Sequence, residues 1–330
     1  MPPDAAPHAA ANLLCIGFDG PTLPPATAEL IAGGVGVVIL FARNAETPAQ
    51  IAKLTHAIRE AADHPVIVCV DQEGGKVQRF EGGFTAVPAA RELADGGEAA
   101  VRVAGRTQAD ELRAVGVDFN LAPVLDVDTN PDNPVIGPRS LSSDPAIVAK
   151  LGVAWIDAMQ REGVAACAKH FPGHGDTTVD SHEDLPRITH DRARLDAVEL
   201  VPFRAAVAAG VASVMTAHVV AESIDADRPA TLSPAVVDGM LRRELGYDGV
   251  VISDDLEMKA ISERMDVGDA AVQAVAAGVD LVLCCHDLDR QRAVIAALAD
   301  AIERGVVSGD RVASAHRRLA RLAASYASAT

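Results

Sequence analysis

The chain has 330 residues, of which 49% are hydrophobic and 23% are charged, and its formal net charge at pH 7 is −17. A chain of this length removes roughly three quarters of its extended surface from water on folding, so a large core is available. Affinity for nucleic acids comes largely from Lys and Arg, and the acidic balance therefore argues against a nucleic-acid partner.

The N-terminal region and the cysteines bear on the cellular compartment. The first Lys or Arg is Arg43, so the basic stretch of a secretory signal is missing. The longest strongly apolar run, residues 31–41, is too short and too rich in glycine to cross a bilayer. Four of the five cysteines lie in short apolar runs, as buried thiols do, and a disulfide scaffold is not expected. The sequence predicts a cytoplasmic monomer without a membrane segment.

Short apolar runs and helical stretches alternate along the chain. The runs are continuous rather than alternating in polarity, which is typical of parallel strands that are covered on both faces. They lie near residues 13–17, 36–41, 66–70, 119–122, 164–168, 213–217, 250–253 and 280–284. Eight such units without a break in composition predict one (β/α)₈ barrel over residues 13–330, with a doubly wound open sheet as the alternative. Residues 1–12 are expected to be frayed.

Several of the expected helices have recognisable ends. Asp144 stands before a proline and opens a helix that runs to Gly163, and Ser233 opens another in the same way that stops at Gly246. Residues 107–115 end a third helix, which is stopped by Gly116. Each helix therefore passes to the next strand through a glycine, as a repeated strand–helix unit requires.

Ionisable residues follow several of the apolar runs. Asp71 follows the third run, Lys169 and His170 follow the fifth, His218 ends the sixth, and Asp254 follows the seventh. In a (β/α)₈ barrel the chemistry takes place at the carboxyl ends of the strands. We therefore expect these side chains to converge on one site.

The segment after the fifth run, residues 169–182, holds one Lys, three His and two Asp, with two Gly and one Pro. One interpretation is a metal site, because imidazole and carboxylate groups suit Zn²⁺ or Fe²⁺. The possible ligands are His170, His174, Asp176 and His182. Against a metal site, no His-x-His pair ends a strand, and Lys169 would place a cation beside the ion. We therefore expect no metal and no cofactor.

A second interpretation of the same segment is acid/base chemistry. Asp180 and His182 are two residues apart, so in an extended loop their side chains point to the same side. A carboxylate in this position accepts a hydrogen bond from one ring nitrogen and makes the other nitrogen a better base. Asp254 is the candidate for a nucleophile or second carboxylate, because an apolar strand delivers it to the barrel mouth. A carboxylate that attacks an acetal carbon forms a covalent glycosyl intermediate, which points to glycoside hydrolysis.

The long polar segment also carries a family resemblance. It resembles the signature loop of glycoside hydrolase family 3, and within that family the single-domain bacterial β-N-acetylhexosaminidases of cell-wall recycling. The similarity extends in order over nearly the whole chain, through residues 71–79, 120–127, 133–140, 169–182 and 253–258. One departure is Lys76, where related sequences often carry Arg.

The resemblance implies a retaining exo-β-N-acetylglucosaminidase that removes terminal N-acetylglucosamine from peptidoglycan fragments (muropeptides). It implies that Asp254 is the nucleophile, and that His182 is the general acid/base, paired with Asp180. It further implies that five residues contact the sugar at the non-reducing end, namely Asp71, Arg79, Arg139, Lys169 and His170.

Three alternatives remain open. A phosphorylase of the same family would use the same residues but transfer the glycosyl group to phosphate. A metal-dependent amidohydrolase on a barrel would use the histidine-rich loop as ligands, and a sugar-binding protein would keep the pocket without turnover. Three nearby residues are interpreted as structural: Glu73 supports a turn, Asp126 holds a loop and His174 shapes its own loop. His218 has two open interpretations, one as a structural residue and one as a functional residue that lines the pocket or helps to position Asp254.

Overall fold

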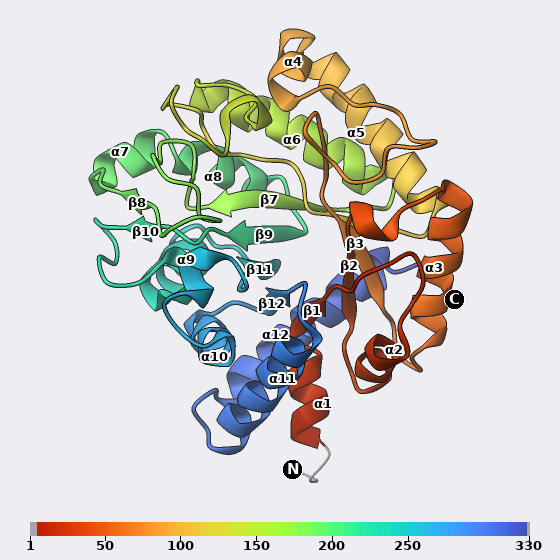
Figure 1. The fold of residues 1–330 in the computed structure, drawn as a ribbon. Coiled ribbons are helices and arrows are strands. Elements are labelled where there is room, and N and C mark those ends of the chain that lie inside the picture. The colour runs from red at the N-terminus through yellow and green to blue at the C-terminus, as the bar shows by residue number, and fades with distance from the viewer. Residues whose placement is uncertain (1–4, 329–330) are drawn as a thin grey trace.

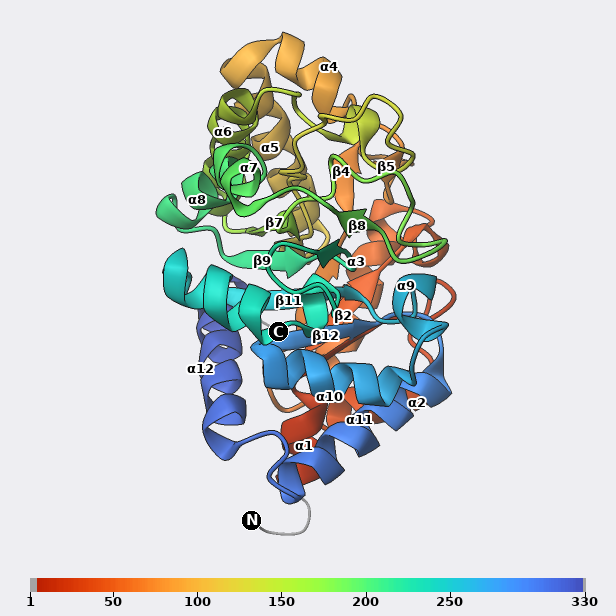
Figure 2. The same cartoon turned by 90° about the vertical axis from the view of Figure 1, so that its left-hand side faces the viewer.

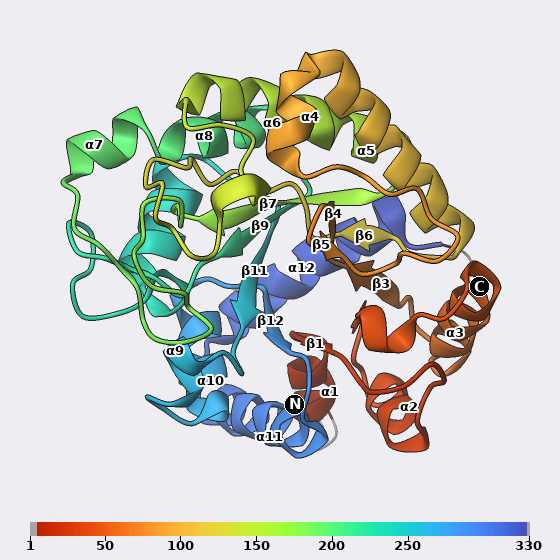
Figure 3. The same cartoon turned by 45° about the horizontal axis from the view of Figure 1, so that its top comes forward.

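Eight parallel strands close into a barrel in the computed structural model, which describes residues 5–328 (Figure 1). The strands are β1 (Leu14–Ile16), β2 (Val37–Leu40), β3 (Ile67–Val70), β6 (Phe119–Asn120), β7 (Ala165–Phe171), β9 (Ser213–Thr216), β11 (Val250–Asp255) and β12 (Leu281–Cys284). They follow one another around the barrel in chain order, and β1 pairs with β12 to close it (Figure 3). Each strand falls on one of the eight predicted apolar runs. The predicted (β/α)₈ barrel is confirmed, and the alternative of an open sheet is wrong.

Helices surround the barrel and join its strands (Figure 1). The longer ones are α2 (Pro25–Ala32), α3 (Pro48–Glu60), α5 (Gly97–Ala114), α6 (Pro145–Arg161), α8 (Leu200–Ala208), η4 (Ala235–Glu244), α10 (Val267–Ala277), α11 (Leu288–Glu303) and α12 (Gly309–Tyr326). The shorter ones are α4 (Ala90–Asp95), α7 (Arg192–Ala197), α9 (Lys259–Ser262), η1 (Ala42–Asn44), η2 (Gly137–Arg139) and η3 (Ala230–Leu232). In the part of the chain that the structure describes, no helix has the length and apolarity that spanning a membrane requires.

The three helix ends that were predicted from capping residues are observed. The Asp144 side chain accepts a hydrogen bond of 2.8 Å from the backbone N–H of Ala146 and caps α6. Helix η4 begins after the Ser233–Pro234 pair and is wound as a π-helix. Helix α5 ends before Gly116, whose φ of +74° favours glycine because a side chain would be strained there.

The first helix, α1 (Ala5–Ala11), corrects the expectation of a frayed segment over residues 1–12. Its Ala6 and Ala10 are at most 1% exposed, and it packs beside α11 (Figure 1). The His316 ring of α12 also contacts the carbonyl of Ala9 at 3.0 Å. Only residues 1–4 of the expected frayed segment lie outside the described residues.

Two small sheets are added at one end of the barrel. An antiparallel hairpin joins β4 (Gln72–Gly74) to β5 (Val77–Gln78), and a parallel pair joins β8 (Arg187–Ile188) to β10 (Val220–Ala221). Both sheets, together with α9, follow the carboxyl ends of barrel strands and gather on the right-hand side of Figure 2. The loops that carry the predicted site residues therefore lie at one end of the barrel.

Candidate active site

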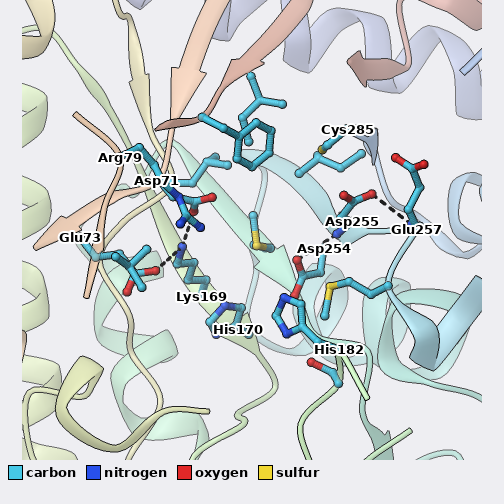
Figure 4. Close-up of a pocket in the computed structure, with 18 of the residues that line it drawn as sticks. Asp71, Glu73, Arg79, Lys169, His170, His182, Asp254, Asp255, Glu257 and Cys285 are labelled. Atoms are coloured by element: carbon cyan, nitrogen blue, oxygen red, sulfur yellow. Dashed lines mark hydrogen bonds and ion pairs between the residues drawn. The ribbon is translucent and has the colours of Figure 1, made fainter. Parts of the chain in front are cut away.

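A cavity of about 660 Å³ opens at the carboxyl ends of the barrel strands (Figure 4). Seven of the eight predicted site residues line it: Asp71, Arg79, Arg139, Lys169, His170, His182 and Asp254. The eighth, Asp180, is held to this wall by its hydrogen bond with His182. A larger hollow of about 910 Å³ lies between α1, α3 and α12, and none of the predicted site residues lines it. The structure therefore brings the predicted site together at the mouth of the barrel.

Strand β11 delivers Asp254 to the cavity through an irregularity. The pairing of β11 with β12 shifts register between Ile252 and Asp255, and bulges of this kind re-aim side chains near active sites. At this irregularity the backbone N–H of Leu283 in β12 donates a hydrogen bond of 2.9 Å to the Ser253 hydroxyl. In regular pairing this N–H would donate to a backbone carbonyl of β11. The backbone N–H of Asp255 donates to Asp254 Oδ1 at 2.9 Å. The other carboxylate oxygen of Asp254 is left for a ligand.

The surroundings of Asp254 keep its carboxyl ionised. Burial on its own raises the pKa of Asp254, because a charge is poorly solvated there. The imidazoles of His170, His218 and His182 and the N–H of Asp255 act in the opposite direction and outweigh burial. The pKa of Asp254 therefore lies below its ordinary value, and the group is a carboxylate at neutral pH.

The loop between β7 and β8 carries His182 and Asp180. The Asp180 carboxylate accepts two hydrogen bonds of 2.8 Å, one from the His182 backbone N–H and one from ring Nδ1. The second bond requires the proton on Nδ1 and leaves Nε2 free for proton transfer. Burial opposes ionisation of Asp180, but the two donors of His182 hold its pKa below the ordinary value. Figure 4 shows the His182 ring beside Asp254, on the same cavity.

Hydrogen bonds join this loop to the next wall of the cavity. The Ser181 carbonyl accepts a hydrogen bond of 3.2 Å from the backbone N–H of Ala260 in α9. Helix α9 follows β11, the strand that carries Asp254. The Ser181 hydroxyl lies 3.1 Å from Nε2 of His174. His182 is 65% exposed at its side chain, whereas Ser181 is buried. The loop is therefore anchored through Ser181, whereas the side chain of the neighbouring His182 extends into solvent.

A buried charge network forms the floor of the cavity opposite His182. The Lys169 ammonium lies 2.6 Å from Asp71 and 2.7 Å from Glu73. Arg139 donates twice to Glu73, at 2.8 and 2.9 Å. Burial lowers the pKa of Lys169, but the two carboxylates raise it above its ordinary value. Glu73 was interpreted as structural from the sequence, yet it lines the cavity and pairs with two of the predicted sugar contacts.

Asp126 holds the fifth predicted contact, His170, in place. Its carboxylate lies 2.7 Å from His170 Nδ1 and also accepts a hydrogen bond of 2.7 Å from the backbone N–H of His174. Because the carboxylate accepts, Nε2 of His170 is the nitrogen left for the cavity. The sequence assigned Asp126 only to a loop, and no spacing signal tied it to a histidine 44 positions later in the chain.

The four candidate metal ligands of the polar segment do not act together. The four have separate partners: His170 pairs with Asp126, His174 contacts Thr177 and Ser181, Asp176 contacts Thr129 and His190, and His182 pairs with Asp180. Among residues 5–328, no group of three His, Cys, Asp or Glu side chains is arranged to hold a metal ion.

Arg79 lines the cavity and has one unpaired donor. Its guanidinium lies 6.0 Å from the centre of the Phe41 ring, and within the described residues its buried Nε has no hydrogen-bond partner. A buried donor without a partner is unfavourable unless a ligand accepts from it. The cavity thus combines acceptors and donors of fixed direction with a carboxylate and an imidazole that lie beside each other. This set can bind the hydroxyl and amide groups of a sugar and can support both nucleophilic attack and proton transfer.

Comparison with known proteins identifies the family of the chain. The model of the glycosyl hydrolase family 3 N terminal domain matches residues 22–322. The chain belongs to glycosyl hydrolase family 3. It is 38% identical over 333 residues to Beta-hexosaminidase A of Pseudoalteromonas piscicida, with 91% of this chain and 55% of that protein covered. It is 42% identical over 295 residues to Beta-hexosaminidase of Alkalilimnicola ehrlichii, with 87% and 84% covered.

Solved structures of family 3 show the same barrel. A β-N-acetylglucosaminidase from Paenibacillus sp. str. FPU-7 superimposes with a TM-score of 0.94 at 45% identity, over 98% of this chain and 64% of that one. NagZ from Neisseria gonorrhoeae in complex with N-trifluoroacetyl-D-glucosamine superimposes with a TM-score of 0.80 at 33% identity, over 94% of this chain and 98% of that one. The chain thus spans little more than half of the Pseudoalteromonas relative and nearly all of NagZ. The predicted family and the predicted class of glycoside hydrolase are confirmed.

Proposed function

We propose that this chain is a retaining exo-β-N-acetylglucosaminidase that removes terminal β-linked N-acetylglucosamine from muropeptides. The observation that carries the proposal is the placement of ionised Asp254 and the Asp180-paired His182 on one cavity. The names of the relatives support the sugar, since two solved structures are a β-N-acetylglucosaminidase and a complex with an N-acylated glucosamine. The muropeptide as substrate follows from the resemblance of residues 169–182 to the cell-wall recycling enzymes.

The reaction proceeds in two displacements at the anomeric carbon. In the first, the free oxygen of Asp254 forms a bond to that carbon while the bond to the leaving oxygen breaks. His182, protonated on Nε2, gives its proton to the leaving oxygen. In the second, neutral His182 takes a proton from water, the water oxygen bonds to the anomeric carbon and Asp254 is released. Two inversions give net retention, and imidazole replaces the second carboxylic acid that most glycosidases use.

The floor of the cavity supplies binding rather than bond chemistry. Asp71 accepts hydrogen bonds from sugar hydroxyls, and Lys169, Arg79 and Arg139 donate from fixed directions. Because Glu73 and Asp71 already orient Lys169, little side-chain freedom is lost when the sugar binds. The role of His170 is to direct Nε2 at the same sugar.

Covalent trapping is the experiment that tests this proposal. A slow fluorinated N-acetylglucosaminide is expected to label the peptide containing residues 246–258, with the mass added to Asp254. Asp254→Asn is the control, and it is expected to remain unlabelled and to lose turnover. Turnover by the wild-type chain with a label on another residue, or with no label at all, would contradict the assignment of the nucleophile.

The products distinguish hydrolysis from the alternatives. Hydrolysis yields free N-acetylglucosamine whether or not phosphate is present, and its first-formed anomer is β. Appearance of the sugar 1-phosphate on addition of inorganic phosphate would establish the phosphorylase instead. Loss of activity after strong chelation would favour metal-dependent chemistry. Monomeric state and a cytoplasmic location stay predictions, which sedimentation and cell fractionation test.

A further inference from the structure

A chain of buried polar side chains lies behind the strand that carries Asp254. Its members are Thr216 at the end of β9, Thr231 in η3, and His218, and all three are 0% exposed. The Thr216 hydroxyl lies 3.0 Å from that of Thr231, and Thr231 Oγ1 lies 2.9 Å from His218 Nδ1. His218 Nε2 lies 3.0 Å from the carbonyl oxygen of Asp255. None of the three lines the cavity.

The partners determine where the proton of His218 lies. The Asp255 carbonyl can only accept, so Nε2 must carry a proton and donate it. Burial lowers the pKa of His218, which favours the neutral ring with an unprotonated Nδ1. The Thr231 hydroxyl lies 2.9 Å from Nδ1 and 3.0 Å from the Ala217 carbonyl oxygen, and it can donate its proton to only one of them. We assign the proton to Nδ1, because an unprotonated ring nitrogen needs a donor, and the Thr231 oxygen accepts from Thr216. Every bond of the chain is thereby directed toward the carbonyl of Asp255.

This carbonyl stands just beyond the point where the pairing of β11 with β9 ends. Strands β9 and β11 are in register up to the pair Thr216 and Ser253, and β11 bulges immediately afterwards. Beyond that pair, His218 supplies to Asp255 a hydrogen bond that a further ladder residue would otherwise make. The N–H of the same residue, Asp255, holds Oδ1 of Asp254. Asp255, whose N–H orients the nucleophile, is therefore followed by a peptide that is held from two sides. The Leu256 N–H donates to the Leu283 carbonyl of β12, and the Asp255 carbonyl accepts from the His218 side chain.

We propose that His218, held in one tautomer by Thr231, is a positioning residue for the nucleophile Asp254. This inference rests on the proposed function, because it assigns His218 a role in the first displacement. His218 does not touch the sugar. Its loss should therefore impair attack by Asp254 while the contacts that bind the substrate remain intact.

Substitution of Thr231 tests the hydrogen bonds without a change in volume. Thr231→Val keeps the shape but removes the donor to Nδ1, and Thr231→Ser restores that donor. With 4-nitrophenyl N-acetyl-β-glucosaminide, we expect kcat per trapped active site to fall at least ~10-fold in Thr231→Val, since a displacement of ~1 Å costs on the order of 100-fold. KM should stay within about threefold of wild type, because uniform binding is unchanged. Thr231→Ser should keep at least about half of the wild-type kcat.

Thr55→Val is the matched control. Thr55 is also buried, and its hydroxyl donates a hydrogen bond of 2.7 Å to the Val115 carbonyl, far from the mouth of the barrel. It removes the same kind of hydrogen bond and is expected to lower stability but to leave kcat unchanged. A kcat of Thr231→Val that matches Thr55→Val would overturn the inference. So would a Thr231→Ser variant that is as impaired as Thr231→Val.

Histidine substitutions give a second, independent readout. Glutamine can place its amide nitrogen near the position of Nε2, so His218→Gln should retain more of kcat than His218→Leu by at least ~5-fold, with similar KM. Equal kcat in the two variants would count against positioning through a hydrogen bond. If the wild-type chain neither turns over nor is trapped, the proposed function fails and this inference fails with it. A fully active Thr231→Val in a working enzyme overturns only the inference.

Discussion

Asp180 and His182 form a contact that depends on one carboxylate oxygen. That oxygen receives both the backbone N–H and the ring Nδ1–H of His182. In Asp180→Asn an amide replaces the carboxylate, so the imidazolium that forms during proton transfer loses its stabilising charge. We expect kcat to fall on the order of 100-fold with a poor leaving group. The fall should be much smaller with 2,4-dinitrophenolate as the leaving group, which needs little protonation.

Asp184→Asn is the matched control for this prediction. Asp184 lies in the same loop, is 64% exposed and pairs with Arg264, so its substitution removes the same charge without touching His182. Steady-state rates on both leaving groups provide the measurement. An equal loss of rate on both substrates would assign Asp180 to structure rather than to proton transfer.

His174 makes the stability of the mouth depend on pH. Burial lowers its pKa from 6.5 to about 4, so the folded chain holds it neutral where the unfolded chain already binds a proton. Its contribution is therefore complete above pH 6.5 and is lost as the pH falls toward 4. The total is about 3 kcal/mol of unfolding free energy.

Urea unfolding between pH 7 and pH 4 checks this window. We expect the plot of unfolding free energy against pH to become flatter in His174→Gln. In the control His56→Gln, which replaces a histidine that is 59% exposed on α3, the slope of this plot should match that of the wild type. A wild-type slope in the His174 variant would show that other groups cause the pH dependence.

At the scale of elements, the barrel strands could be predicted because their burial leaves a direct trace in the sequence. Every residue of β3 and β12 is buried, and a strand covered on both faces reads as a continuous apolar run. The pairs β4–β5 and β8–β10 could not be found in this way, because their strands have two or three residues and β4 and β5 are polar or glycine-rich.

Site residues could be predicted where a strand end or a short spacing marks them in the sequence. They could not be predicted where the feature is a contact between two residues that are far apart in the chain. Asp254 and His182 were found from a strand end and a short spacing. Glu73 pairs with Arg139 across 66 positions, and Asp126 pairs with His170 across 44. The bulge of β11 and the bonds that fix it arise only after the sheet has formed. Sequence reasoning therefore located the candidate reacting groups and Asp180, but it missed that Glu73 and Asp126 orient the predicted sugar contacts.

Glu73 connects three elements, since it lies on β4 and pairs with Lys169 of β7 and Arg139 of η2. Glu73→Gln leaves these buried cations without their full countercharge, and we expect a loss of about 3 kcal/mol in unfolding free energy at pH 7. Although burial opposes ionisation, Arg139 and Lys169 hold the pKa of Glu73 well below 4.5. The contribution is therefore present above pH 4.5 and is lost as the pH falls further.

Urea unfolding of Glu73→Gln at pH 7 and pH 3 provides the measurement, with Glu29→Gln on α2 as a control that removes an exposed carboxylate. The difference from wild type should narrow at the lower pH for Glu73 alone. A constant difference at both values would mean that the substitution acts through packing instead of charge.

At the scale of the whole molecule, α1 completes the outer layer although its sequence gives no clear period. Short alanine-rich segments bury little surface each, and here the burial depends on α11 and α12 from the other end of the chain. Removal of residues 1–11 deletes three buried alanines and uncovers the surface against which they pack, which corresponds to about 2 kcal/mol. We expect the Tm to fall by about 3 °C. An unchanged Tm in calorimetry would restore the expectation of a frayed segment.

Net charge affects how an anionic substrate reaches the site. The cavity is lined by five carboxylates and five Lys or Arg side chains, so the −17 of the whole chain dominates at long range. Salt screens this repulsion, and kcat/KM for a carboxylate-bearing muropeptide should rise between about 20 and 200 mM NaCl. Neutral chitobiose is the control, and its kcat/KM should not change. A similar response for both sugars would rule out repulsion as the cause.

The contacts of the His182 loop suggest a division of labour that engineering can use. The predicted proton donor lies on a segment that contacts the neighbouring wall through the Ser181–Ala260 bond, whereas the predicted sugar contacts come from other elements, with Lys169 and His170 on barrel strand β7. A transplanted loop of equal span would therefore exchange one leaving-group preference for another and leave recognition of the glycone as it was.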